Sequence, residues 1–170
     1  RGDCEMKNVA SVIFIIVAVT ALLGIAACDH GLSPLNARSD PGIAGILRIR
    51  SAWPPADSVR DLRVVAFRNY PPNDILTEVI TGSAVFSDEI PYGEEEIPYI
   101  ITAEALAGVF EYVAVAQNYG DDMFQDWRAI GVYTVTGDVQ TPTPVDLAEG
   151  LFLRDIDIDV DFYNMPPQPF

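Results

Sequence analysis

The chain has 170 residues, of which 49% are hydrophobic and 21% charged, so it has enough apolar material for the packed core of one domain. Acidic residues outnumber basic ones by 25 to 10, which gives a net charge of −15. Nucleic acids are bound by Lys and Arg side chains that contact phosphate, so this balance argues against a nucleic-acid partner. Cations, sugars and proteins stay open as ligands.

The N-terminal segment has the organisation of a bacterial export signal. Lys7 precedes an almost unbroken apolar run over residues 9–27. A basic start, an apolar stretch and small residues before a cleavage site are typical of secretory signals. The run ends in Ile-Ala-Ala-Cys at residues 25–28, which resembles the lipobox of bacterial lipoproteins. This resemblance implies cleavage before Cys28 and attachment of diacylglycerol to its thiol. The alternative is an uncleaved membrane-spanning helix, since about 20 apolar residues cross a bilayer.

The lipobox divides the chain into four expected parts. Residues 1–27 form the signal peptide, and the five residues ahead of Met6 are expected to come from upstream translation. Residues 28–42 hold the lipidated cysteine and a flexible tether, because Gly, Pro and Ser break any periodicity there. Residues 43–163 form the folded domain and residues 164–170 a proline-rich tail. The expected location is the cell envelope, at the outer membrane or cell surface, with the periplasmic face of the inner membrane as the alternative.

Beyond the tether, alternating apolar residues and a high β-branched content predict strands. The expected strands are residues 43–50, 62–68, 75–81, 83–86, 97–102, 109–117, 127–135, 145–148 and 151–162. The one helix-like stretch, residues 103–107, is too short to be stable alone. The pattern predicts an all-β fold: a single antiparallel Greek-key β-sandwich of about seven to nine strands, following an N-terminal apolar signal helix.

Three of these segments resemble the strands of transthyretin-like domains, the class that includes carboxypeptidase regulatory domains. They are residues 45–49 (Gly-Ile-Leu-Arg-Ile), residues 61–67 (Asp-Leu-Arg-Val-Val-Ala-Phe) and residues 108–116 (Gly-Val-Phe-Glu-Tyr-Val-Ala-Val-Ala). The last resembles the family pattern Gly-x-Tyr-x-Val-x-Val, with Phe110 in the tyrosine position. The resemblance implies a transthyretin-like or immunoglobulin-like sandwich with an accessory or binding role.

Four aspartates alternate with apolar residues over residues 155–162. A period of two sends the apolar side chains into the core and lines the aspartates along the opposite face, about 7 Å apart. The spacing mimics a calcium loop, but Val160 stands where such a loop needs Gly, and an extended strand cannot wrap round one ion. We therefore expect a solvated face whose repulsion is relieved by cross-strand ion pairs. The expected partners are Arg48 and Arg50 for Asp157 and Asp159.

The loop over residues 118–128 concentrates acidic and aromatic side chains, and its Asn-Tyr start repeats at residues 69–70. We expect these two loops and Trp53 to form an aromatic patch at one end of the sandwich, suited to a carbohydrate or a protein partner. The candidate ligand or partner residues are Trp53, Tyr70, Tyr119, Asp121, Asp122, Asp126 and Trp127. The three aspartates among them are also weak calcium candidates. The alternative is that the aromatic rings close the ends of the core and the Asn and Asp residues form turns.

Catalytic residue types are scarce. The one histidine, His30, lies in the tether, and Cys4 and Cys28 precede the domain, so neither a nucleophile–histidine pair nor a zinc site is expected. No cofactor is expected beyond the calcium alternative. The sequence predicts an envelope lipoprotein, bound to the bilayer through diacylglyceryl-Cys28, that acts as a non-catalytic protein-interaction or structural module. The alternatives are a carbohydrate- or calcium-binding surface module and a small hydrolase that uses two carboxylates.

Overall fold

The computed structural model describes residues 41–73, 75–102, 106–122 and 125–169. They lie in the second of two compact units of the chain, Ser39–Phe170. The expected signal peptide, Cys28 and the tether up to residue 40 lie outside the described residues. Within the described ranges, no helix has the length and apolar character needed to span a membrane.

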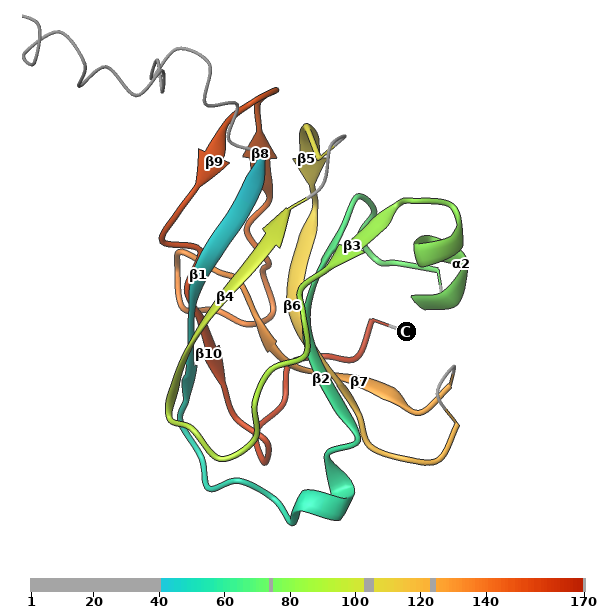
Figure 1. Cartoon of the computed structure of the whole chain (residues 1–170), viewed down its shortest axis with the longest axis vertical. Coiled ribbons are helices and arrows are strands. Elements are labelled where there is room, and N and C mark those ends of the chain that lie inside the picture. The colour runs from blue at the N-terminus through green and yellow to red at the C-terminus, as the bar shows by residue number, and fades with distance from the viewer. Residues whose placement is uncertain (1–40, 74, 103–105, 123–124, 170) are drawn as a thin grey trace, which may run out of the picture. The chain divides into compact units, whose positions relative to one another are not determined.

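Most of the described strands belong to one mixed β-sheet with the strand order β3-β2-β6-β7-β10-β1-β4, in which β9 also pairs with β1 (Figure 1). Its strands are β1 (Gly42–Ile49), β2 (Asp61–Phe67), β3 (Ala84–Phe86), β4 (Glu96–Thr102), β6 (Tyr112–Asn118), β7 (Trp127–Val132), β9 (Phe152–Leu153) and β10 (Ile158–Val160). A second sheet pairs β5 (Gly108–Phe110) with β8 (Val145–Leu147). One turn of 3-10 helix, η1 (Ala56–Ser58), lies between β1 and β2.

The all-β prediction is confirmed, but the expectation of purely antiparallel pairing is wrong. The first strand, β1, runs parallel to β9 and β10 and antiparallel to β4. The last segment of the domain therefore returns to lie beside the first one in the same direction. Because β10 also pairs antiparallel with β7, it joins the β1–β4 half of the sheet to the β2–β6–β7 half.

Residues 75–80 form a helix instead of most of the strand expected over residues 75–81. This helix, α2 (Ile75–Ile80), is followed by a turn at Gly82, whose φ of 73° suits glycine. Ile75 and Val79 are four residues apart and share one face of the helix, where both contact the core. Glu78 is buried, and its carboxylate accepts hydrogen bonds from the side chains of Asn69 and Asn73. The β-branched residues favoured a strand, but these contacts with the preceding loop favour the helix.

Three expected strands also differ in their extent. Residues 109–117 divide at Glu111, so that β5 joins the small sheet and β6 the main one. The strand expected over residues 127–135 ends at Val132 as β7. The strand expected over residues 151–162 is interrupted between β9 and β10.

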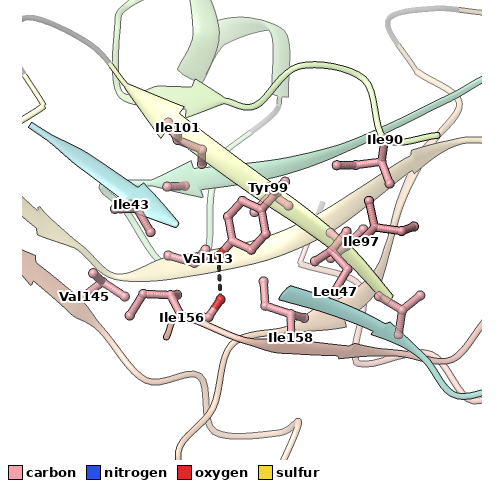
Figure 2. Packing of buried hydrophobic residues seen from close by; sticks show 14 of the residues in the cluster. Ile43, Leu47, Ile90, Ile97, Tyr99, Ile101, Val113, Val145, Ile156 and Ile158 are labelled. Carbon is pink, nitrogen blue, oxygen red and sulfur yellow. Dashed lines mark hydrogen bonds between the residues drawn. The ribbon is translucent and has the colours of Figure 1, made fainter. Parts of the chain in front are cut away.

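The main core lies between the two halves of the curled sheet. Ile43 and Leu47 of β1 and Ile97 and Ile101 of β4 point into it from one half, and Val113 of β6 from the other (Figure 2). The apolar residues of the aspartate row also lie here, as expected. They are Ile156, Ile158, Val160 and Phe162, and all four are buried.

The sheet is also covered on the outer face of its β2–β6–β7 half. Every residue of β6 is buried, because its side chains alternate between the main core and a second cluster. That cluster contains Phe67, Tyr112 and Val132, against which Ile75 and Val79 of α2 pack. Burial on both faces explains why β6 is apolar along most of its length instead of alternating.

The segment that joins β9 to β10 lies unusually close to the backbone of β1. Gly42 and Ile43 pair with Phe152 and Leu153, but Leu47 pairs with Ile158, so the later segment carries one extra residue, as in a β-bulge. The extra length arches over Gly45, where a Cβ atom would lie 2.1 Å from the Ile156 oxygen. On the other side of β10, a Cβ atom on Gly131 would lie 2.7 Å from the Asp159 oxygen. Glycine at these two positions lets the neighbouring backbones approach.

Two hydrogen bonds fix the arch over Gly45. The buried Tyr99 hydroxyl donates to the Ile156 oxygen at 2.6 Å, as the dashed line in Figure 2 shows. The Ile46 N–H donates to Asp157 Oδ1 at 2.9 Å. Burial, and secondly the Asp157 charge, raise the pKa of the Tyr99 phenol. The hydroxyl therefore stays protonated and able to donate across the ordinary pH range.

The proline-rich tail packs on the domain. Pro166 is buried, and the Gln168 side chain bonds both backbone groups of Ala129 in β7 at 2.9 Å. Its Oε1 accepts from the Ala129 N–H, and its Nε2 donates to the Ala129 oxygen. The Gln168 amide therefore takes the place of a paired strand on this part of β7.

We predict that Tyr99→Phe lowers the free energy of unfolding by about 1–2 kcal/mol, because the Ile156 oxygen loses a buried donor while the ring still fills the core. Urea denaturation at pH 7 measures this change. Tyr163→Phe is the matched control, since Tyr163 is exposed, and its stability should equal that of the unmodified chain. Equal effects of the two substitutions would contradict the role given to the Tyr99 hydroxyl.

Candidate functional site

The segment over residues 118–127, here called the Tyr119 loop, joins β6 to β7. Its two ends are tied together, since the Tyr119 N–H donates to the Asp126 oxygen at 2.9 Å. Within it, Asp126 Oδ2 accepts from the Asp122 N–H at 2.9 Å, and Asp122 Oδ1 accepts from the Gln125 N–H at 3.1 Å. The Arg128 guanidinium stacks over the Tyr119 ring, 5.0 Å from its centroid. These contacts hold the described parts of the loop, residues 118–122 and 125–127, against each other.

Two buried amide side chains hold the base of this loop. Gln117 Nε2 donates to the Ser58 oxygen at 2.7 Å, and its Oε1 accepts from Arg128 Nε at 3.0 Å. Asn118 Nδ2 donates to the Asp122 oxygen at 3.2 Å. Gln117 thus connects η1 to β7 at the base of the Tyr119 loop.

A pocket of about 330 Å3 lies at this end of the sheet and is here called the Tyr119 pocket. It is lined by Arg60, Asp61, Asn118, Gly120, Asp121 and Trp127. The Asp121 side chain is 94% exposed and pairs with Arg60 Nη2 at 3.0 Å. Asp61 pairs with Arg63 at 2.8 Å. Trp127 is half-buried and packs partly against the second core cluster. The pocket therefore combines one aromatic ring with charged and amide groups.

The three calcium candidates, Asp121, Asp122 and Asp126, form bonds within the loop or to Arg60. Asp122 and Asp126 accept backbone hydrogen bonds, and Asp121 binds Arg60. Among the residues that the structure describes, no group of three or more His, Cys, Asp or Glu side chains is placed to hold a metal ion. Calcium binding at these residues stays an untested prediction, and the geometry adds no support to it.

The structure does not assemble the expected single aromatic patch. Asp61 pairs with Asn118 and Phe67 with Tyr112, so Tyr70 lies at the opposite end of β2 from Tyr119. Tyr70 stacks on Tyr112, with 5.0 Å between the ring centroids.

Trp53 belongs to a third group of rings. It lies between Tyr92 and Phe162, at centroid distances of 4.8 and 5.0 Å, and its Nε1 donates to the Glu94 oxygen. The repeated Asn-Tyr pair misled the prediction, because β2 and β6 are antiparallel neighbours and their C-terminal ends point in opposite directions. Of the candidate aromatic residues, only Tyr119 and Trp127 belong to the Tyr119 loop.

The expected pairing between the aspartate row and the first strand is confirmed. Arg48 Nη2 lies 2.6 Å from Asp157 Oδ2, and Arg50 Nη2 lies 2.9 Å from Asp159 Oδ1. Asp157 is the more buried of the two aspartates and also accepts from the Ile46 N–H. Burial raises the pKa of the Asp157 carboxyl, but the Ile46 N–H and the Arg48 guanidinium outweigh burial and hold that pKa below its ordinary value.

A larger groove, here called the β4 groove, lies along β1, β4 and β9. Its volume is about 930 Å3, and its apolar lining includes Ile46, Pro98, Ile100 and Phe152. Arg48 and Asp157 form part of its wall, and Arg154 stacks over the Phe152 ring at 4.8 Å. Ile100 is 49% exposed. The β4 strand is the last one in the main sheet, so among the described residues no strand covers its outer edge.

The sequence pointed to Arg48 and to the aspartates of the β4 groove, but not to its apolar residues. Residues 97–102 are predicted as an ordinary strand, and the sequence gives Ile100 no special position within it. In the structure β4 alternates strictly between exposed and buried positions, which places Ile100 outside. Pro98 was the available signal, because proline in a strand occurs on sheet edges. No pattern in the sequence marks Arg60 as a residue of the Tyr119 pocket.

Comparison with protein-family models, with curated proteins and with solved structures gives no match for this chain. Its function must therefore be inferred from its own residues.

We predict that Asp157→Ala lowers the free energy of unfolding by about 2 kcal/mol at pH 7, because the Ile46 N–H and Arg48 both lose their acceptor. The folded carboxyl has a lowered pKa, so its stabilisation is complete above the ordinary value of about 3.9 and is lost as pH falls through the folded value. The difference between the two proteins should therefore shrink below about pH 4. Urea denaturation at pH 7, 5 and 3 measures it.

Asp159→Ala is the matched control for this substitution. Asp159 lies two residues further along the chain, in β10, but forms an exposed pair with Arg50, so the change should be within about 0.5 kcal/mol at every pH. A loss in Asp157→Ala that is no larger than in this control, or that does not vary with pH, would contradict the prediction.

Proposed function

We propose that this chain is a lipoprotein of the bacterial cell envelope, held at the membrane by diacylglycerol on Cys28, whose β domain acts by binding another envelope protein. The outer membrane or the cell surface is the proposed location. The role is one of interaction rather than catalysis. From residue 41 onward the sequence contains no histidine and no cysteine, the residues on which most nucleophilic and zinc-dependent mechanisms depend.

The anchor is supported by the sequence and by where the domain begins. The small residues before Cys28 follow directly on the apolar run, which is the order that lipoprotein processing requires. The first described strand begins at Gly42, so residues 29–41 would separate the lipid from the domain. Thirteen residues span at most about 45 Å when fully extended. The domain would therefore act close to the membrane surface.

The observation that carries the binding role is the β4 groove. An exposed apolar side chain, Ile100, lies beside a sheet edge that no described strand covers. Such edges bind extended segments of other proteins by strand addition, with side-chain pockets giving specificity. Pro98 lacks an N–H group, so a partner strand would find one donor missing. That gap limits pairing between arbitrary strands and favours a partner fitted to the groove.

The proposed occupant is an extended, basic segment of an envelope protein. The net charge of −15 repels acidic partners and steers basic ones toward the domain. A second copy of this chain is disfavoured by the same charge. Within the groove, Asp155 provides an acceptor for a cationic side chain, and Ile46, Ile100 and Phe152 provide apolar contacts.

The transthyretin-like relationship stays a prediction. The three segments that carry the resemblance fall on β1, on β2 and on β5 with β6. That all three segments form strands, in the order of the family pattern, supports proposing a two-layered β fold of this kind. The Greek-key sandwich is proposed on the same basis.

We predict that Cys28→Ala abolishes incorporation of labelled fatty acid and moves the protein from the membrane to the soluble fraction of a bacterial host. The reason is that the thioether to diacylglycerol needs this thiol. Fatty-acid labelling followed by membrane fractionation measures both effects. Cys4→Ala is the matched control, because it removes the other cysteine and should leave both unchanged. Lipid label on the Cys28→Ala protein would sink the anchor proposal.

We predict that a photoreactive residue at position 100 cross-links to one basic, extended segment of an envelope protein in intact cells. The same residue at position 80 is the control. Ile80 is 74% exposed on α2, at the other end of the sheet, and should give no adduct. Mass spectrometry identifies the cross-linked segment.

A synthetic peptide of that segment then tests the contact directly. Ile100→Asp should weaken its binding to the full chain about tenfold, since burial of an aliphatic side chain contributes roughly 1.5–3 kcal/mol and tenfold is 1.4 kcal/mol. Ile80→Asp should leave binding unchanged. An acidic segment, or equal weakening by both substitutions, would contradict the proposal.

A further inference from the structure

The Tyr119 pocket has the composition of a small-molecule site. Its volume of about 330 Å3 lies at the lower end of the range for ligand pockets, about 300–1,000 Å3. Such sites combine an apolar or aromatic surface with a few polar groups in fixed positions. Here Trp127 supplies the aromatic surface, and Arg60, Asp121 and Asn118 supply polar groups. Only small ligands, of about the size of one sugar ring, fit a pocket of this volume.

The charges of the lining decide which small ligands suit it. Asp61 and Asp121 provide two carboxylates and Arg60 the one guanidinium of the lining, so the pocket has no excess positive charge to bind an anionic ligand. Both carboxylates are already paired with arginines, Asp121 with Arg60 and Asp61 with Arg63. A metal ion would have to displace those cations. The arrangement therefore favours a neutral ligand that both donates and accepts hydrogen bonds.

The aromatic wall points to the same class. Trp127 is the first residue of β7 and pairs with Asn118 of β6, so the sheet sets its backbone position, and its side chain packs partly against the second core cluster. Sugar rings have an apolar face of C–H groups and a rim of hydroxyl groups. An indole ring can contact that face, while carboxylates, amides and guanidinium groups bind the rim. A site with one ring and several planar polar groups matches both parts of a saccharide.

The pocket is also formed before any ligand binds. Gln117 and Asn118 hold its base, and the hydrogen bonds between Asp122 and Asp126 hold the loop. Gly120 lies so close to Asp126 that a Cβ atom there would be 2.1 Å from Oδ2. A preformed site loses less conformational entropy on binding, so a few contacts suffice for measurable affinity.

We propose that the Tyr119 pocket binds a neutral saccharide, with the sugar ring against Trp127 and its hydroxyl groups bonded by Asp121 and Arg60. This inference goes beyond the proposed function. Saccharide binding requires neither the lipid on Cys28 nor a protein in the β4 groove. The two proposals therefore stand or fall on separate measurements.

The chain provides its own probe for this site, because it contains only two tryptophans, Trp53 and Trp127. In the full-length Trp53→Phe protein, purified from membranes in detergent, all tryptophan emission comes from Trp127. We would titrate it with glucose, galactose, mannose, N-acetylglucosamine and their disaccharides, and with glucuronic acid as the anionic arm. We expect a saturable change in emission with at least one neutral sugar, at a Kd of about 1 mM.

Substitution at the pocket rim then assigns the binding to this site. Asp121→Ala should raise the Kd about fivefold, through loss of a hydrogen bond to the sugar. Because Asp121 is almost fully exposed, this change should not affect folding. Asp88→Ala, which removes an exposed carboxylate outside the pocket, is the matched control and should leave the Kd unchanged. Trp127→Phe, followed by calorimetry, should also weaken binding.

Three results would overturn the proposal. The first is the absence of a saturable change with every neutral sugar. The second is tighter binding of glucuronic acid than of any neutral sugar, which would assign the pocket to anions. The third is an equal effect of Asp121→Ala and Asp88→Ala, which would place the binding elsewhere on the chain.

Discussion

The three-residue strand β10 joins the two halves of the main sheet, and the rest of the domain depends on how closely its neighbours approach it. On one side it pairs with β1 over three positions, and on the other with β7 at a single position. Gly131 lies against β10 itself, and Gly45 lies against the arch that precedes it, so that a Cβ atom at either position would be too close to the neighbouring backbone. A side chain at either position would therefore force the neighbouring segments apart. The main core, the β4 groove and the position of the tail all depend on this junction between the two halves of the sheet, here called the seam.

The same seam explains why the two candidate sites are separate. The β4 groove lies on the half of the sheet that contains β1, where the arch between β9 and β10 shapes its wall. The Tyr119 pocket lies on the other half, at the end of β2, β6 and β7. The first site is mainly apolar and lies along a sheet edge, which suits an extended chain. The second is small and polar around one ring, which suits a compact ligand. One domain thus offers two different kinds of surface.

The sequence was informative where side-chain periodicity decides structure and much less so where pairing between distant strands does. Alternation placed Ile156, Ile158 and Val160 in the core, and charge alone was enough to pair the aspartate row with Arg48 and Arg50. Parallel pairing of β1 with β10 leaves no local signal, because either direction buries the same residues. The direction in which β2 and β6 pair leaves no local signal either, so the sequence could not predict that Tyr70 and Tyr119 lie at opposite ends of β2. The helix α2 was missed because its stability comes from contacts with the core and with Asn69 and Asn73 rather than from helix propensity.

The contact between Gln168 and Ala129 has a consequence for how the chain resists self-association. The side-chain amide occupies one N–H and one C=O group that β7 would otherwise present to another molecule. Unoccupied strand groups of this kind are templates for pairing between chains, and from there for fibrous aggregates. Proteolytic trimming that removes Gln168 would leave every core contact of the sheet in place and yet uncover such a template. The Gln168 amide thus shields a strand of the sheet as well as holding the tail in place.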